Sequence, residues 1–176
     1  MRWSDINIYD RTLTVNQSLE QTRGGGLRFK SPKSKRGRRR ISIPGLLADA
    51  LEPHRHEQDK QKAKFGADYK DHGLVVCLAD GAPWPPDSFS GSYVYFAGKI
   101  GAGGVRFHDL RHTHASQLLR QGTPVKTVSQ RLGHSTAAIT LNVYGHVLSG
   151  DDERATDEFD RILKNEFEKR PNQKAN

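Results

Sequence analysis

The sequence predicts an α+β domain that is mainly helical and carries a small antiparallel sheet of three strands. Short segments rich in β-branched residues lie near the N-terminus, at residues 11–15 and 41–44, as is typical of strands. From residue 44 onward, apolar residues recur every three or four positions, which is the spacing of one helix face. The 176 residues, of which 34% are hydrophobic, are enough for one core.

The composition favours a polyanionic partner. The net charge is +8, which points to nucleic acid, although a ribosomal protein or a basic tail would show the same excess. The chain contains one cysteine, which excludes an internal disulfide and a zinc site of several thiolates. No apolar run approaches the roughly 20 residues of a membrane span, and the first residues do not resemble a signal peptide. We therefore expect a cytoplasmic, nucleoid-associated protein without a membrane partner.

The first residues, from Trp3 to Ile8, are interpreted as the end of a helix that runs into a strand. No capping residue or leader precedes them, so we expect the domain to be cut at its front. A short strand at residues 11–15 follows. Residues 22–29, which include glycines at 24–26, are expected to form a flexible connection.

Nine Lys and Arg residues and no acid lie between Thr22 and Arg40. Such a block is often a solvated loop. Here an alternating segment, residues 41–44, follows at once, which favours a β-hairpin with residues 35–38 at its turn. A hairpin of this kind could reach DNA phosphates, and the solvated loop remains the alternative. The residues expected to bind DNA are Lys33, Arg36, Arg38 and Arg39, together with Lys126.

Pro44 is expected to begin a helix that continues through the polar stretch 53–65. Its apolar stripe would consist of Leu46, Leu47, Ala50 and Leu51. Residues 73–78 are interpreted as a buried strand that includes Cys77. The next helix is expected to open at residues 86–89, and its apolar spacing assigns four residues to the core: Phe89, Tyr93, Phe96 and Ile100.

Three further helices are expected between residues 109 and 143. The first runs from about Asp109 to Arg120, stops at Gln121-Gly122, and buries Leu110, Ala115, Leu118 and Leu119. The second opens at Pro124, repeats Val125, Val128 and Leu132, and breaks at Gly133. The third is capped by Ser135 or Thr136. After a Ser-Gly linker, an amphipathic tail helix presents Phe159, Ile162, Leu163 and Phe167. We therefore divide the chain into a domain at 1–148 and a tail at 149–176.

The candidate chemistry depends on four residues in the second half of the chain. His108 and Arg111 are three apart, so one helical turn places them on the same face. His134 follows Arg111 by 23 residues and Tyr144 follows His134 by ten. Breaking a DNA phosphodiester without metal needs a nucleophile, cations on the phosphate oxygens and an acid for the departing 5′ oxygen. Tyr144 could attack.

Basic residues could bind the phosphate oxygens and protonate the departing 5′ oxygen. Arg111 could bind two phosphate oxygens, and His108 and His134 could contact the phosphate or handle the tyrosine proton. Lys35 could be the acid, and no cofactor is required. His112 and His114 are interpreted as core or surface residues. Zinc is disfavoured because the histidines lack a His-Glu-x-x-His spacing and a nearby carboxylate.

Three motifs together resemble the catalytic half of the tyrosine recombinases, the group of phage integrases and Xer-type resolvases. They are His108-Asp-Leu-Arg111-His-Thr-His-Ala-Ser116, Leu132-Gly-His134-Ser135 and Tyr144-Gly-His146, preceded by the basic stretch 32–44. The resemblance covers residues 2–147. It implies that Lys35, with Lys33 as the rival, is the general acid, that His108, Arg111 and His134 hold the phosphate, and that Tyr144 forms a 3′-phosphotyrosine without ATP or metal. It also implies a tetramer on two DNA duplexes, in which the tail helix packs on a neighbouring protomer or folds back on its own.

One departure from this family limits the expected activity. The first of the family's two active-site arginines lies upstream of the stretch that resembles Arg2-Trp3-Ser4-Asp5, so it has no counterpart in these residues. We therefore expect a truncated catalytic domain with very weak recombination or none. Two alternatives are a non-catalytic DNA-binding remnant and a type IB topoisomerase-like nicking and closing enzyme. The short spacing from His134 to Tyr144 favours the recombinases.

Overall fold

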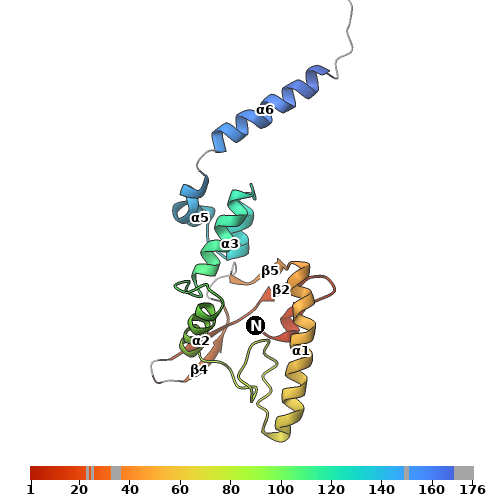
Figure 1. The fold of residues 1–176 in the computed structure, drawn as a ribbon, viewed down its shortest axis with the longest axis vertical. Coiled ribbons are helices and arrows are strands. Elements are labelled where there is room, and N and C mark those ends of the chain that lie inside the picture. The colour runs from red at the N-terminus through yellow and green to blue at the C-terminus, as the bar shows by residue number, and fades with distance from the viewer. Residues whose placement is uncertain (23, 25, 33–36, 149–150, 169–176) are drawn as a thin grey trace, which may run out of the picture.

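The computed structural model describes residues 1–22, 24, 26–32, 37–148 and 151–168 (Figure 1). It confirms an α+β fold that is mainly helical. The helices are α1 (Gly45–Phe65), α2 (Pro86–Lys99), α3 (Asp109–Arg120), α4 (Val125–Leu132), α5 (Ala137–Tyr144) and α6 (Asp151–Glu168). Short 3₁₀ turns lie at Trp3–Asp5, Gly66–Asp68 and Gly145–Leu148. The helices expected between residues 109 and 143 are confirmed.

The predicted three-stranded antiparallel sheet is also confirmed. It consists of β1 (Ile6–Asn7), β2 (Thr12–Val15) and β5 (Arg39–Ser42), in the order β1-β2-β5. Leu13 lies opposite both Ile6 and Ile41, so apolar side chains share one face of the sheet. The sheet lies beside α1 (Figure 1), where Ile6 and Leu13 pack against a core cluster that consists of Ile43, Ala48, Leu51 and Val75.

A second antiparallel pair corrects the expectation of a flexible connection over residues 22–29. It joins β3 (Ser18–Gln21) to β4 (Leu27–Lys30), with Leu19 opposite Phe29. The turn between them is closed by the Thr22 amide, which donates to the Gly26 carbonyl at 2.8 Å. Gly24 and Gly26 therefore lie at the tip of a hairpin, and Gly25 lies outside the described residues.

The prediction that the strands on either side of residues 35–38 pair with each other is therefore wrong. Its two flanking strands pair elsewhere, because β4 pairs with β3 and β5 pairs with β2. The basic stretch thus connects a strand of one sheet to a strand of the other. Lys33, Lys35 and Arg36 lie outside the described residues.

The helices α3, α4 and α5 form a second core. It consists of Ala115, Leu119, Val128, Leu132 and Tyr144, all at most 6% exposed. Gly133 ends α4 in the left-handed conformation (φ 74°). This conformation favours glycine, and a Cβ atom there would lie 2.6 Å from Nη1 of Arg39, so a side chain would displace the Arg39 guanidinium.

Several expected core positions are exposed. In α1, Leu46 and Leu47 are 84% and 44% exposed and Ala50 is exposed, because Ala48 and Leu51 face the sheet instead. In α2, Phe96 and Ile100 are exposed and Ala97 is buried. Phe89 and Tyr93 are partly buried and belong to neither core cluster, and their rings pack on Phe107 at centroid distances of 5.0 and 5.4 Å. Leu110 is 44% exposed.

Residues 73–78 do not form the expected strand. Leu74 and Val75 are buried, but the segment is irregular and shares one bridge with Arg2. The Val75 amide donates to the Met1 carbonyl at 3.2 Å, so the N-terminus provides its pairing. Cys77 is partly buried, and Nε2 of Gln58 lies 3.1 Å from its sulfur.

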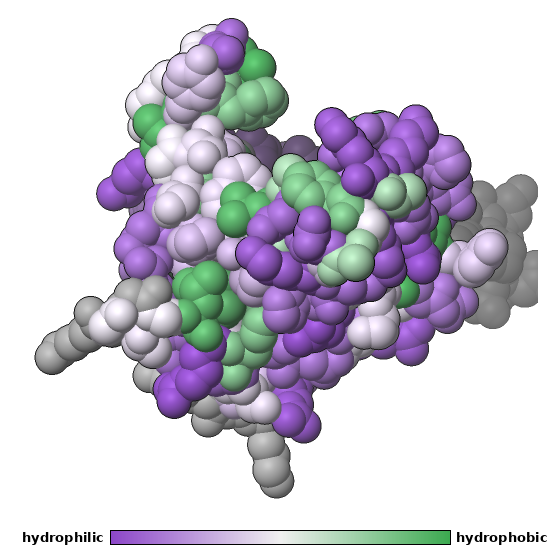
Figure 2. Space-filling view, turned by 90° about the horizontal axis from the view of Figure 1, so that it is seen from below, coloured by the Kyte–Doolittle hydropathy of each residue, from purple (hydrophilic) through white to green (hydrophobic). Residues whose placement is uncertain are grey.

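Helix α6 projects away from the rest of the fold (Figure 1). Its Phe159, Ile162 and Leu163 are 60%, 50% and 39% exposed. Figure 2 shows another face, where hydrophilic residues dominate and hydrophobic ones form separate patches. Among the described residues, none of the helices combines the length and hydrophobicity that crossing a bilayer requires.

We predict that Leu119→Ala lowers the free energy of unfolding by roughly 2–5 kcal/mol, because it leaves a cavity between α3 and α4. Leu46→Ala is the matched control. Leu46 is 84% exposed, so its truncation should change stability by no more than about 0.5 kcal/mol. Urea denaturation followed by circular dichroism measures both. Equal effects of the two substitutions would contradict the assignment of the core.

Candidate active site

The N-terminus of α3 presents His108 to solvent. His108 occupies the N-cap position and is exposed. Asp109 fixes the turn that precedes the helix, because its carboxylate accepts from the Arg106 amide at 2.8 Å and from Nη2 of Arg106 at 2.9 Å. These bonds lower the pKa of Asp109, the side-chain bond to Arg106 most of all. Asp109 therefore remains ionised and paired, and His108 is left accessible.

Two guanidinium groups are anchored on neighbouring carbonyls at the C-terminus of α4. Arg111 donates from Nη2 to the Leu132 carbonyl at 2.8 Å, and Arg39 donates from Nε to the Arg131 carbonyl at 2.8 Å. The C-terminal end of a helix carries partial negative charge, which favours cations there. Partial burial, then the charge of Arg111, lowers the pKa of Arg39. The two like charges are thus held close enough to interact.

His134 joins these two cations. It follows Gly133, its amide donates to the Ser129 carbonyl at 3.1 Å, and its Nδ1 lies 2.8 Å from Oγ1 of the buried Thr140. Burial, followed by the charges of Arg111 and Arg39, lowers the pKa of His134. The ring is therefore mainly neutral at pH 7, and an anion bound beside it would favour protonation.

Tyr144 lies at the end of α5 and is 3% exposed. Its Oη lies 3.0 Å from Nδ1 of His112, and the two ring centroids are 5.6 Å apart. His112 in turn contacts His108 at a centroid distance of 5.1 Å. His108 and Tyr144 are therefore connected through a residue that the sequence analysis left among the core or surface histidines.

The structure sorts the predicted site residues into two groups. Arg111 and His134 meet at the end of α4, together with Arg39, which the sequence analysis assigned to DNA binding. His108 and Tyr144 meet at His112. The sequence spacing could have placed His112 in the site, because residues 108 and 112 are four apart and share a face of α3 with Arg111. His114, by contrast, is at the surface and accepts a long contact from Nε of Arg131 at 3.5 Å.

A basic groove of about 770 Å³ lies between β5 and α4. Among the described residues that line it, none is acidic. Arg38 and Lys126 are exposed there, whereas Arg39 is partly buried. The basic members of the lining are Arg38, Arg39, Arg40, Lys126, Arg131 and His134. A concave surface of one charge suits a polyanion.

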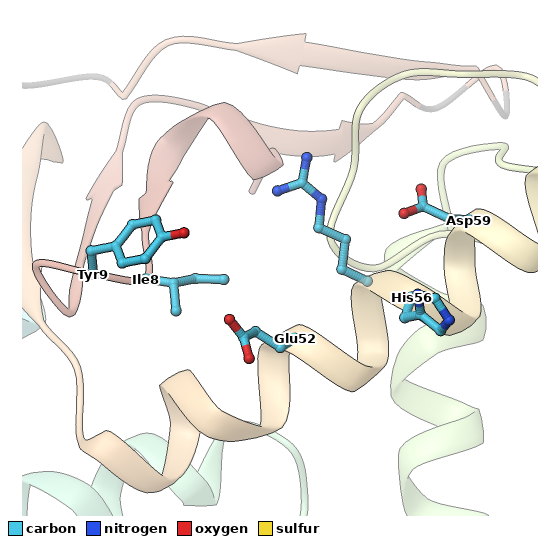
Figure 3. Close-up of a pocket in the computed structure, with 6 residues that line it drawn as sticks. Ile8, Tyr9, Glu52, His56 and Asp59 are labelled. Atoms are coloured by element: carbon cyan, nitrogen blue, oxygen red, sulfur yellow. The ribbon is translucent and has the colours of Figure 1, made fainter.

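A smaller hollow of about 240 Å³ lies between the β1–β2 turn and α1 (Figure 3). Ile8 and Tyr9 line it from the turn, and Glu52, His56 and Asp59 line it from α1. Arg55 also lines it, but the two carboxylates offset that charge, so the hollow is a poor site for a phosphate. Within the part of the chain that the structure describes, no three His, Cys, Asp or Glu side chains are grouped to hold a metal ion.

Comparison with curated proteins finds recombinases over most of the chain. A XerC-like tyrosine recombinase of Caldanaerobacter subterraneus is 32% identical over 159 residues, covering 84% of this chain and 41% of that protein. The ICEBs1 integrase of Bacillus subtilis is 29% identical, covering 93% of this chain and 44% of that protein. The chain therefore spans less than half the length of these relatives.

Solved structures share the fold. The integrase of transposon Tn1549, in complex with transposon right end DNA, superposes with a TM-score of 0.72 at 21% identity, covering 93% of this chain and 52% of that one. The XerA recombinase gives a TM-score of 0.63 at 19% identity, covering 92% of this chain and 50% of that one. The sequence pattern that defines the Phage integrase family matches residues 1–150, and the chain belongs to this family.

Proposed function

We propose that this chain is the catalytic part of a tyrosine recombinase, which cuts and rejoins DNA strands in site-specific recombination or integration. The observation that carries the proposal is the placement of Arg111 and His112 on one helix. Arg111 reaches the cationic group at the end of α4, while His112 reaches the hydroxyl of Tyr144. A phosphate held by the first group would lie beside the nucleophile.

The proposed reaction assigns one task to each residue. The Tyr144 oxygen attacks phosphorus, the bond to the 5′ oxygen breaks, and a 3′-phosphotyrosine forms. Arg111 stabilises the charge on the non-bridging oxygens, with His108 and His134 as further contacts. Lys35 protonates the departing oxygen, with Lys33 as the rival. Attack by a 5′ hydroxyl of another strand reverses the step, so neither ATP nor a metal is consumed.

The chain spans less than half the length of these curated relatives. We therefore propose recombination as an activity of a whole protein of that length and not of residues 1–176 alone. For residues 1–176 alone we expect little or no strand exchange, since the family's first active-site arginine has no counterpart in them. Double-stranded DNA is the proposed partner, bound along the basic groove by Arg38, Arg39 and Lys126, with Lys33 and Arg36 as further contacts. Work on chromosomal DNA would place the protein at the nucleoid in the cytoplasm.

We also propose that residues 149–176 act as a tail that joins protomers in a tetramer on DNA. The support is the exposed apolar stripe of α6, which consists of Phe159, Ile162 and Leu163. A helix that presents such a stripe gains stability when a partner covers it. A second copy of the chain is the proposed partner.

Tyr144→Phe is expected to abolish a covalent adduct between the protein and a nicked suicide duplex taken from the ends of the element that encodes it. The full-length protein should form this adduct, which denaturing gel electrophoresis detects. Tyr9→Phe is the control, since Tyr9 is 96% exposed and lies in the β1–β2 turn, and it should retain the adduct. Salt-sensitive binding without an adduct would instead support a non-catalytic DNA-binding module, and relaxation of supercoils without strand exchange would support the topoisomerase-like alternative.

Lys126→Ala and Arg38→Ala are expected to weaken DNA binding and to flatten its salt dependence. Each lost phosphate contact should reduce the slope of log K against log salt by about 0.9. Lys60→Ala on α1 removes an exposed lysine outside the groove and should leave the slope unchanged. Fluorescence anisotropy at several salt concentrations makes the comparison, and equal slopes for all three variants would rule out the groove as the binding surface.

The double substitution Ile162→Ser and Leu163→Ser should weaken assembly of the protein on DNA, because it removes the apolar stripe of α6. Arg161→Ser and Lys164→Ser, on the polar face, form the matched control and should assemble as the wild type does. Analytical ultracentrifugation of the DNA complexes reports the stoichiometry. Tetramers that persist in the first variant would exclude the tail as the connecting element.

A further inference from the structure

We propose that His112 is a catalytic residue that accepts the hydroxyl proton of Tyr144 as that oxygen attacks phosphorus. The proposal rests on the proposed function and assigns a role that the sequence analysis left to His108 or His134. It follows from the position of the imidazole relative to the reacting atom.

The hydrogen bond to Tyr144 places His112 beside the reacting oxygen. Tyr144 is 3% exposed, so its hydroxyl needs a protein acceptor or a bound water for its proton. Among the described residues, Nδ1 of His112 at 3.0 Å is the acceptor placed to receive it. The neutral imidazole with its proton on Nε2 fits this arrangement, since Nδ1 then offers a lone pair.

The other two histidines are placed for different tasks. His134 turns its Nδ1 to Thr140, at 2.8 Å, and lies near the charges of Arg111 and Arg39. His108 contacts the His112 ring edge to face, with an interplanar angle of 73°, and is exposed. The histidine within reach of the nucleophile is therefore His112, while His134 is grouped with the cations.

The position of His112 is set by the fold. It lies one turn into α3, and the same helix buries Ala115 and Leu119 in the core that contains Tyr144. The hydrogen bond thus spans two helices that pack against a common set of side chains. A proton acceptor held in this way needs little reorganisation before the reaction.

The proposed step is balanced. A bond forms between the Tyr144 oxygen and phosphorus, and the proton of that oxygen moves to Nδ1 of His112, which becomes an imidazolium. The bond from phosphorus to the 5′ oxygen breaks, and its electron pair stays on that oxygen, which takes a proton from the general acid. In the reverse reaction the imidazolium returns its proton to Tyr144, so the cycle is complete after rejoining.

The first test measures the rate of adduct formation by the full-length protein on the suicide duplex. His112→Phe should lower this rate by about 10²-fold or more. Replacing Tyr144 with 2,3-difluorotyrosine, whose phenol is more acidic, should restore at least part of the rate in this variant. His56→Phe, the same substitution on α1, should react as the wild type does.

The rescue separates proton transfer from a merely structural role, because a packing defect would not respond to the acidity of the phenol. An unchanged rate in His112→Phe, or a loss that difluorotyrosine does not relieve, would overturn the proposal and leave the proposed function intact. Absence of a Tyr144-dependent adduct in the wild type would overturn both.

The second test needs no DNA. In protein labelled with ¹⁵N-histidine, the Nδ1 resonance of His112 should move when Tyr144→Phe removes the hydroxyl and keeps the ring. The resonances of His56 should stay in place. If the His112 resonance does not move, the hydrogen bond is absent in solution and the proposal fails, whatever the cleavage assay shows.

Discussion

The C-terminal end of α4 holds the candidate site together. Two consecutive backbone carbonyls, of Arg131 and Leu132, accept hydrogen bonds from Arg39 and Arg111. One of these arginines comes from the sheet and the other from α3, so a single helix end connects the two halves of the fold. The partial negative charge of that end offsets some of the repulsion between the two cations, and an anion bound between them would offset more.

This arrangement depends on features beyond the site itself. Gly133 lets the chain turn sharply after α4 and leaves room for the Arg39 guanidinium. The turn then delivers His134 to the same place, where Thr140 orients its ring. The core beneath, formed by Leu119, Val128 and their neighbours, fixes α3 relative to α4 and α5. The proposed nucleophile belongs to this core, so folding also positions the hydroxyl that is to react.

Much of the architecture was predictable because its signals are local. Pro44, Pro124 and Gly133 mark helix ends through their own backbone restrictions, and the observed helices begin and end beside them. The pairing of β3 with β4 was missed because glycines at 24–26 suit a flexible connection as well as a hairpin tip. Leu46 was expected to be buried, but Ala48 faces the sheet in its place. Tertiary packing decides which side of α1 faces the sheet, and the spacing of apolar residues in the sequence does not show it. Arg39 was expected only to bind DNA, and His112 was not expected in the site, because their partners lie 92 and 32 positions away in the chain.

The central claim is that the hydroxyl oxygen of Tyr144 forms the covalent bond to DNA. The direct measurement is mass spectrometry of the trapped complex after digestion with trypsin and nuclease. Cleavage after Arg131 and Arg154 yields a peptide of residues 132–154 in which Tyr144 is the only tyrosine. The account predicts that this peptide carries the nucleotide, on Tyr144, as a 3′-phosphate ester. A nucleotide on any other residue, or a complex without a covalently modified peptide, would contradict it.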